Sequence, residues 1–318
     1  MKRITALFVL LLTLAALYGQ KVEPLPFGDF NSWVTREIKE SRLIGGDVKK
    51  CYAIGPTRTI TGDKPYTGTG GAPWATSNVM AKVMGITKVS NKVYPHDRGN
   101  GNKCAMLCTG MEHCQAIGII DIDVVVAGTI FLGRMIEPIK STSNPYQKME
   151  MGIPFTGRPA ALCYDYMLEI PANAVKTYSS GFGKKREIPG SDKAEVFIIL
   201  QRRWEDSDGN LHAKRVGTGR ELLGKSTGQW CNGHKLHVHY GDITGNPDYR
   251  PYMGLIKKEK SYYACNSKGK MVPVVEEGWD DSDATPTHLL VMFSSGSGEP
   301  YTGTIGTNFY VDNVALAY

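Results

Sequence analysis

Glycine and proline interrupt this chain so often that long helices have little room. The 318 residues include 36 Gly and 17 Pro, which together make one residue in six. Glycine weakens a helix interior through its backbone entropy, and proline lacks the N–H donor that a helix needs. The chain is therefore expected to fold from short segments joined by turns.

The apolar segments between these breaks have the two-residue period of β-strands. Residues 161–170 (ALCYDYMLEI) place Tyr164 and Tyr166 on one face and Asp165 on the other. Residues 194–204 (AEVFIILQRRW) are a second segment rich in strand-forming types. Successive side chains of a strand point to opposite faces, so both segments predict strands.

Turn residues predict how these strands connect. DSDGN at 206–210 predicts a tight turn into a returning strand. Residues 117–133, rich in Ile and Val, are broken by Gly128, which predicts two successive buried strands. Residues 287–295 and 307–318 predict two final strands, joined either as a hairpin or by a crossover.

One segment has helical spacing instead. In residues 74–86, Val79, Met80, Val83 and Met84 recur at intervals of three and four. Gly85 is suited to end a helix. We therefore expect a short helix here that covers one end of a sheet.

The overall pattern predicts an all-β fold, an antiparallel β-sandwich of jelly-roll type with little helix. Hydrophobic residues make up 42% and charged residues 21% of the chain, which is typical of a globular protein. No linker, repeat or charge block divides residues 21–318. We expect these residues to form a single domain of the jelly-roll type.

The first 20 residues have the pattern of a signal peptide. Lys2 and Arg3 precede an apolar stretch over residues 4–17, which is short for a membrane span. The first cysteine is Cys51, so no thiol lies where a lipoprotein signal requires one. We expect an exported protein, periplasmic or extracellular, that is not a lipoprotein and has no membrane span once the signal is removed.

The charge distribution does not favour nucleic acid as a partner. The formal net charge is +6, and two of the positive charges are Lys2 and Arg3 in the predicted signal. The basic clusters at 184–186 and 257–260 are followed by acidic or neutral residues. A nucleic-acid binder usually carries a concentrated basic stripe.

A histidine-rich segment is compatible with a metal site. On a strand, His237 and His239 would project from one face, as two ligands of one metal would. No third ligand is identified, and the alternative is a pair of solvent-facing imidazoles. The sequence does not distinguish these two interpretations.

Glycoside hydrolysis would require two carboxyl groups facing one sugar ring. Four carboxylates have apolar neighbours, which could raise a pKa: Glu112, Glu137, Asp165 and Glu169. The same residues are also suited to structural hydrogen bonds. Whether the protein is an enzyme therefore stays open.

Four blocks of the sequence resemble a known family. Residues 27–56, 70–86, 130–168 and 293–318 are together similar to the exported bacterial proteins of the putative carbohydrate metabolism domain family. The last block, with its VDNVAL pattern, resembles the endings of jelly-roll carbohydrate-binding modules. The resemblance implies a jelly roll and a role in handling glycans outside the cytoplasm.

The resemblance also implies a cofactor. In related jelly rolls, an Asp in the terminal strand can help to hold a structural calcium, which makes Asp312 with Asp29 a candidate site. Carboxylate oxygens are suitable ligands for this ion. No other cofactor is expected.

These observations predict an exported protein that binds an oligosaccharide or polysaccharide on a concave strand face, the alternative being a glycoside hydrolase that uses two carboxylates on that face. Aromatic rings would stack on the sugar, and polar groups would fix its hydroxyls. The candidates are Trp33 and Trp74 as stacking groups, Arg134 and Arg158 as donors, Tyr164 and Tyr166 as wall residues, and Glu137 and Asp165 as acceptors.

Overall fold

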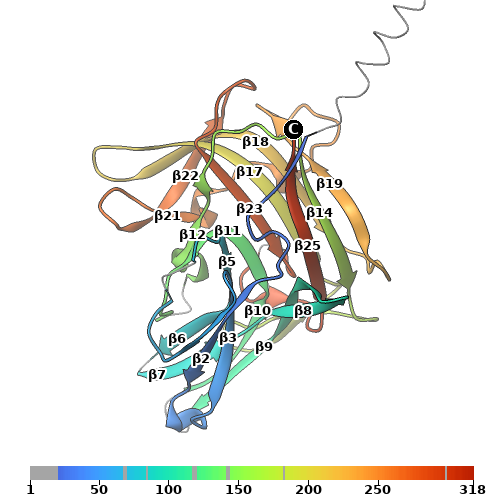
Figure 1. The fold of residues 1–318 in the computed structure, drawn as a ribbon. Coiled ribbons are helices and arrows are strands. Elements are labelled where there is room, and N and C mark those ends of the chain that lie inside the picture. Colours follow the sequence, from blue (N-terminus) through green and yellow to red (C-terminus); the bar gives the residue numbers. More distant parts are fainter. Residues whose placement is uncertain are drawn as a thin grey trace, which may run out of the picture.

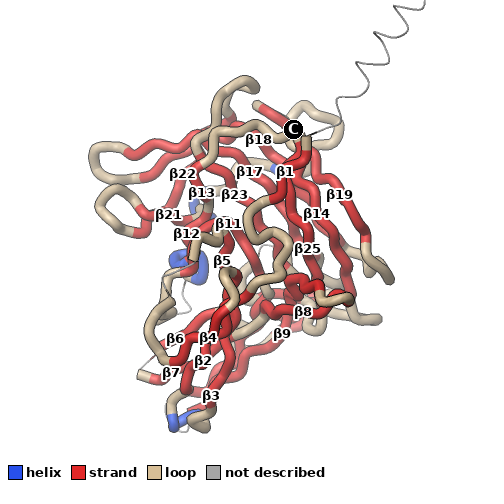
Figure 2. The backbone as a smooth tube through the Cα atoms, viewed as in Figure 1, coloured by secondary structure: helices blue, strands red, loops and turns tan. Residues whose placement is uncertain are grey.

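The structure is a computed structural model that describes residues 21–66, 70–83, 85–116, 120–140, 144–181, 183–297 and 299–318. Strands account for nearly all of its regular structure (Figure 2). Its helices are single 3₁₀ turns, namely η1 (Arg42–Ile44), η2 (Pro145–Lys148), η3 (Pro251–Met253) and η4 (Lys258–Lys260). None of the described helices is long and apolar enough to cross a membrane.

Two large sheets make up most of the fold (Figure 1). The first has seven strands: β1 (Val22–Pro24), β8 (Val93–Gly99), β9 (Asn102–Ala116), β10 (Ile120–Ala127), β14 (Ala161–Glu169), β19 (Cys231–His237) and β25 (Asn308–Ala317). The second has ten: β5 (Trp74–Thr76), β11 (Thr129–Met135), β12 (Met149–Met151), β13 (Ile153–Pro154), β17 (Ala194–Glu205), β18 (Leu211–Leu223), β20 (His239–Tyr240), β21 (Tyr263–Cys265), β22 (Met271–Trp279) and β23 (His288–Ser294).

Three small sheets complete the described part of the chain. They are β2 (Trp33–Lys39) with β3 (Val48–Ile54) and β4 (Arg58–Thr61), the pair β6 (Val79–Val83) and β7 (Ile86–Ser90), and β15 (Lys176–Tyr178) with β16 (Arg186–Ile188) and β24 (Thr302–Gly303). In Figure 1, β2, β3, β6 and β7 lie below the ten-stranded sheet, beside β9 and β10.

Part of the ten-stranded sheet closes on itself. Its path runs β23, β17, β18, β22, β21, β12 and β11, and a further pairing of β11 with β23 joins the two ends. We call this closed path the seven-strand ring. It gives the ring strands an inner face as well as an outer one.

Strand β17 shows how the sequence fills both sides of the ring wall. Val196 and Ile198 belong to the main core, which also contains residues of the seven-stranded sheet. Phe197 and Ile199 belong to a second core with Met151 of β12. Because both faces are buried, this strand reads as a continuous apolar run rather than a simple alternation. Burial of each such side chain stabilises the fold by about 1.5–3 kcal/mol.

The all-β prediction is confirmed, and the segments predicted at 161–170, 194–204 and 117–133 appear as β14, β17 and the successive pair β10 and β11. The two final strands predicted at 287–295 and 307–318 appear as β23 and β25, which lie in different sheets, so their connection is a crossover. Pairing is not purely antiparallel as predicted, because β2–β4, β12–β21 and β18–β22 pair in parallel.

The helix predicted over residues 74–86 is wrong. This segment forms β5, β6 and the start of β7, while Met84 lies outside the described residues. Asn78 lies between β5 and β6. Its side chain donates to the carbonyls of Tyr52 and Val93 and accepts from the N–H groups of Lys92 and Val93, which fixes the turn between β5 and β6. Tertiary hydrogen bonding therefore overrides the local helical spacing.

Candidate functional site

A cavity of about 530 Å³ lies at one end of the seven-strand ring. The ring contributes residues from the first position of β12, the start of β17 and the last residues of β23. The pair β6–β7 and strand β10 also line the cavity. Its volume lies within the roughly 300–1,000 Å³ that is usual for small-molecule sites.

Aliphatic side chains line most of the cavity wall. Alternate residues of β6, which are Val79, Ala81 and Val83, face the cavity and are only half-buried. Strand β10 adds Ile122 and Val124. Strands bring every second side chain to one face, so two short apolar strands suffice to build this wall.

A charged pair lies at the ring end of the cavity. Glu195 Oε1 accepts hydrogen bonds from Arg220 Nε at 2.6 Å and Arg220 Nη2 at 2.5 Å. The Glu195 side chain is 1% exposed and that of Arg220 is 18% exposed. Both donors converge on one oxygen, and within the described residues neither Glu195 Oε2 nor Arg220 Nη1 has a hydrogen-bond partner. We call Glu195 and Arg220 the charged floor.

Burial sets the electrostatics of this floor. Burial raises the pKa of Glu195, although the neighbouring Arg220 works against this rise. Tyr146 and Tyr262 also line the cavity, with ring centroids 6.1 Å apart. Burial raises the pKa of Tyr146 to about 12, so its phenol stays neutral. The floor therefore places an acceptor and a donor beside neutral phenols.

Ion pairs lie around the rest of the lining. Lys260 pairs with Glu299, and both side chains are at least half exposed. Glu112, one of the predicted carboxylates, lines the cavity and pairs with Lys92 at 2.7 Å. The cavity thus has polar groups at the floor and on the more exposed side, with an apolar zone elsewhere.

Residues 56–246 match the model of the family described as putative carbohydrate metabolism domain, which is more than half of the chain. The chain belongs to this family. No curated protein gives a match. Among solved structures, the chain is similar to a putative glycoside hydrolase from Bacteroides thetaiotaomicron, with 18% identity and a TM-score of 0.46 over 86% of this chain and 81% of that one. A likeness of this size assigns no activity to this family member.

The two tryptophans predicted to stack on sugar are core residues. Only 4% of Trp33 and 1% of Trp74 is exposed. Their indole N–H groups donate to the carbonyls of Phe30 at 2.6 Å and Pro26 at 3.0 Å. A sugar needs an accessible ring face, so this stacking prediction is wrong. Both rings instead anchor the segment before β2.

The two predicted arginine donors are already engaged. Arg134 pairs with Glu150 at 2.6 Å on the exposed side of β11. Arg158 lies over the ring of Tyr240 at 4.1 Å and donates to the carbonyls of Ser282 and Ala284. Neither arginine lines the large cavity.

The four predicted carboxylates lie in four separate surroundings. Glu112 lines the large cavity, whereas Glu137 lines a separate one of about 90 Å³. Glu137 is 2% exposed and accepts two hydrogen bonds from Arg36, at 2.7 and 2.8 Å, and two from backbone N–H groups. Glu169 is exposed and accepts from the phenol of Tyr310 at 3.0 Å. No two of the four share a partner, so they do not form the predicted catalytic pair.

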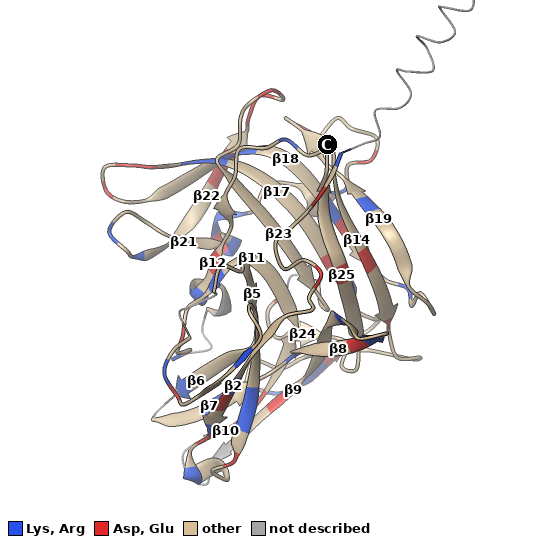
Figure 3. Cartoon of the chain, viewed as in Figure 1, with Lys and Arg blue, Asp and Glu red and all other residues tan. Residues whose placement is uncertain are grey.

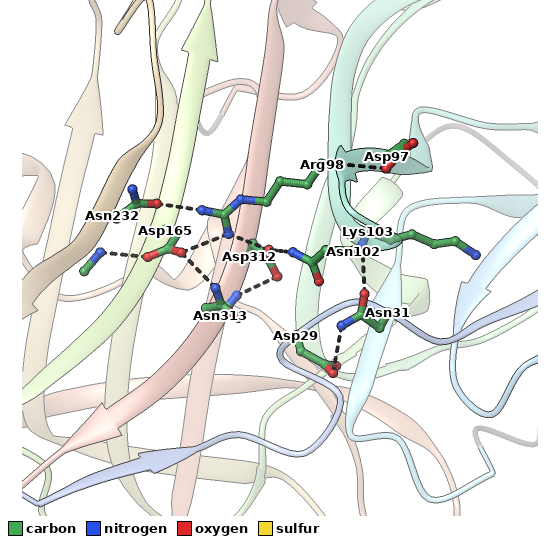
Figure 4. A network of polar contacts seen from close by, with 12 residues as sticks. Asp29, Asn31, Asp97, Arg98, Asn102, Lys103, Asp165, Asn232, Asp312 and Asn313 are labelled. Atoms are coloured by element: carbon green, nitrogen blue, oxygen red, sulfur yellow. Dashed lines mark hydrogen bonds and ion pairs between the residues drawn. The ribbon is translucent and has the colours of Figure 1, made fainter.

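Asp165 belongs to a polar network across the seven-stranded sheet (Figure 4). It lies opposite Asp312 on the neighbouring strands β14 and β25, which carry adjacent acidic segments in Figure 3. Arg98 Nη1 donates to Asp165 at 2.9 Å and to Asp312 at 2.5 Å, and its guanidinium lies 3.9 Å from the ring centroid of Trp230. Burial raises the pKa of Asp312, while the hydrogen bond from Arg98 lowers it.

This network does not fit the calcium site that the family resemblance implies. Arg98 lies between the carboxylates and supplies the positive charge there. Asp29 accepts a hydrogen bond from the side-chain amide of Asn31 at 3.2 Å (Figure 4). Within the described residues no group of three His, Cys, Asp or Glu could hold a metal. The prediction of Asp29 and Asp312 as joint ligands is therefore wrong.

The histidine pair is separated by the fold. His237 ends β19 in the seven-stranded sheet, and His239 starts β20 in the ten-stranded one. His234 of the same segment instead bonds to Glu221 at 3.0 Å. The two imidazoles do not share one strand face, contrary to the pattern that a metal would need.

The predicted wall residues Tyr164 and Tyr166 do lie together. Their ring centroids are 5.6 Å apart, and both rings contact His234. Tyr164 is 1% exposed and donates its hydroxyl to Glu221 at 2.5 Å. Neither tyrosine lines the large cavity. They are part of the sheet packing rather than of the candidate site.

Sequence reasoning missed Glu195 and Arg220. Glu195 stands alone in the apolar run of β17, and Arg220 lies near the end of β18. A charged residue inside an apolar strand is the signal that could have identified the first. The second depends on strand pairing, because Arg220 lies opposite Phe197, two residues from Glu195.

Proposed function

We propose that this chain is an exported carbohydrate-binding protein that holds a sugar-containing ligand in the cavity at the end of the seven-strand ring. The observation that carries this proposal is the charged floor. Within the part of the chain that the structure describes, Glu195 Oε2 and Arg220 Nη1 engage no other side chain or backbone group, so the two can bind two neighbouring hydroxyls of a sugar. The name of the family supports a carbohydrate ligand.

The site works through charge-assisted hydrogen bonds away from water. Such bonds contribute more than neutral ones, about 1.5–3 kcal/mol each. Two of them would account for a substantial preference for a diol over a ligand without hydroxyls. Because Glu195 and Arg220 hold each other in place, little side-chain entropy remains to be lost on binding.

We also propose an architecture and a destination for the chain. We propose that residues 21–318 form one domain, that its two large sheets are the layers of a jelly-roll sandwich, and that residues 1–20 are a signal peptide. The shared core supports the single domain, since residues of both sheets pack in it. Determination of the N-terminus of the protein recovered from cell fractions tests the export proposal.

The binding test uses a double variant that leaves no charge unpaired. Glu195→Gln with Arg220→Gln is expected to lower the affinity for glycans found in an array screen by more than tenfold, with native circular dichroism retained. The matched control is Glu187→Gln with Arg186→Gln, on the exposed strand β16, which should bind like the wild type. Equal binding by the two double variants would exclude the charged floor as the site.

Hydrolysis is the second candidate function, and two observations favour it. The raised pKa of Glu195 suits a general acid, and Glu112 lines the same cavity. If the protein is a glycosidase, Glu195→Gln and Glu112→Gln each abolish the release of reducing sugar from the glycan that binds. Binding with no release by the wild type would identify a binding protein.

A further inference from the structure

The lining of the cavity sets a limit on what the ligand can be. Its charged floor can satisfy a few hydroxyls, but the walls beside it are aliphatic. A sugar ring against these walls would lose its bound water and gain no hydrogen bond in return. An oligosaccharide with hydroxyls along its whole length therefore fits the cavity poorly.

The walls also present apolar surface that the described residues leave partly exposed. Val79, Val83 and Ile122 line the cavity and remain only partly buried. Met135 and Ile139, which also line it, are partly buried as well. A concave apolar surface of this kind is typical of a small-molecule site rather than of a protein interface.

We propose that the ligand is a sugar that carries an apolar substituent, an alkyl or acyl chain. This proposal rests on the proposed function and names the class of its ligand. The hydroxyls of the sugar bind Glu195 and Arg220, and the chain lies along β6 and β10. The ligand is thus a glycolipid-like or acylated saccharide rather than a plain polysaccharide.

A series of alkyl glycosides tests the proposal on the wild-type protein. Methyl, butyl, hexyl and octyl β-glycosides of glucose, galactose and mannose are titrated by calorimetry below their critical micelle concentrations. Each buried methylene should raise the affinity by roughly fourfold until the cavity is full. A sugar-free amphiphile, octyl tetraethylene glycol, serves as the reference for the chain alone.

The outcomes separate the two proposals. A rise in affinity with chain length that also requires the sugar supports both. If methyl glycosides or free oligosaccharides bind as tightly as octyl glycosides, the substituent proposal fails and the proposed function survives. If the sugar-free amphiphile binds as well as octyl glycosides, the proposed function fails. No binding by any member of the series overturns the substituent proposal.

A matched pair of variants places the chain in the cavity. Ile122→Asn, on the wall formed by β10, should reduce the gain in affinity from methyl to octyl glycoside by at least fivefold. Ile188→Asn replaces an isoleucine that is 39% exposed on β16 and does not line the cavity, so it should keep the full gain. An unchanged gain in a folded Ile122→Asn protein would contradict the proposal. The wild-type series remains decisive if that variant does not fold.

Discussion

The interior of the seven-strand ring contains an ion pair whose removal should be costly. Glu276 and Arg215 both have side chains with 0% exposure. Glu276 accepts from Arg215 Nε at 2.6 Å and Nη2 at 2.5 Å, from Gln201 at 2.6 Å and from the N–H of Ile256 at 2.7 Å. Since Leu255 and Ile256 line the cavity, this carboxylate also holds the loop that closes the candidate site.

The substitution Glu276→Gln tests this account. The new amide offers one acceptor oxygen and one NH₂ donor in place of two acceptor oxygens, so at least two of the four hydrogen bonds lose their acceptor. Arg215 then becomes a buried charge without an ionised partner. Breaking such a pair costs about 3–5 kcal/mol, and we expect urea unfolding at pH 7 to report a loss in this range.

The neighbouring residue provides the control. Glu277 has a side chain that is 45% exposed and pairs with His212, so Glu277→Gln should change the free energy of unfolding by no more than about 0.5 kcal/mol. A loss below 1 kcal/mol for Glu276→Gln, or equal losses for the two variants, would refute the reasoning.

The ion pair of Glu276 with Arg215 also predicts how stability depends on pH. Burial alone would raise the pKa of Glu276, but Arg215 together with the hydrogen bonds from Ile256 and Gln201 outweighs this effect, and the pKa is lowered. A carboxylate whose pKa is lowered by folding stabilises the protein above its unfolded pKa of about 4.3, and the contribution is lost as the pH falls through the folded pKa. The difference between wild type and Glu276→Gln should therefore shrink below about pH 4.

Further substitutions test other parts of the fold. Arg98→Gln leaves the fully buried Asp312 without its cation, so urea unfolding should show a larger loss at pH 7 than at pH 4; equal losses would contradict this. Burial lowers the pKa of His288 to about 4, so as the pH falls this histidine takes up a proton in the unfolded chain before it does so in the folded protein. The free energy of unfolding should therefore fall from pH 6.5 to 4, and His288→Gln should remove this fall. Trp74→Ala should cost about 3–5 kcal/mol in thermal unfolding, yet leave the affinity of the folded protein for glycans unchanged.

The strands were predictable where the pattern is local. Residues 161–170 and 194–204 alternate or run apolar over a full strand length, and both form strands. Gly128 marks the break between β10 and β11 for a steric reason. A Cβ at this position would lie 2.2 Å from the carbonyl oxygen of Lys92, so another residue type would require the backbone to move.

The pairing between strands that are distant in the sequence could not be predicted from local patterns. The parallel pairing of β18 with β22 joins Leu211 to Val274, and the closure of the ring joins Phe131 to Met292. Nothing within either segment specifies the other. The purely antiparallel expectation failed for this reason, since it assumed neighbours in sequence to be neighbours in the sheet.

The candidate site was the least predictable part. Aromatic residues were expected at the site because they suit sugar binding, but Trp33 and Trp74 also suit a core, and the fold buries them. Val79 and Val83 fit a helix by spacing and a strand by alternation, and the structure places both on a strand that lines the cavity. Glu195 and Arg220 become partners through the β17–β18 pairing, which no local motif encodes.

The most direct test of the central claim is the position of a bound sugar. A crystal of the protein soaked with octyl glycoside should show the sugar ring within hydrogen-bond distance of Glu195 Oε2 and Arg220 Nη1, with the octyl chain between β6 and β10. Density for the sugar elsewhere, for example at Arg98 and Trp230 on the seven-stranded sheet, with the cavity free of ligand, would contradict the account.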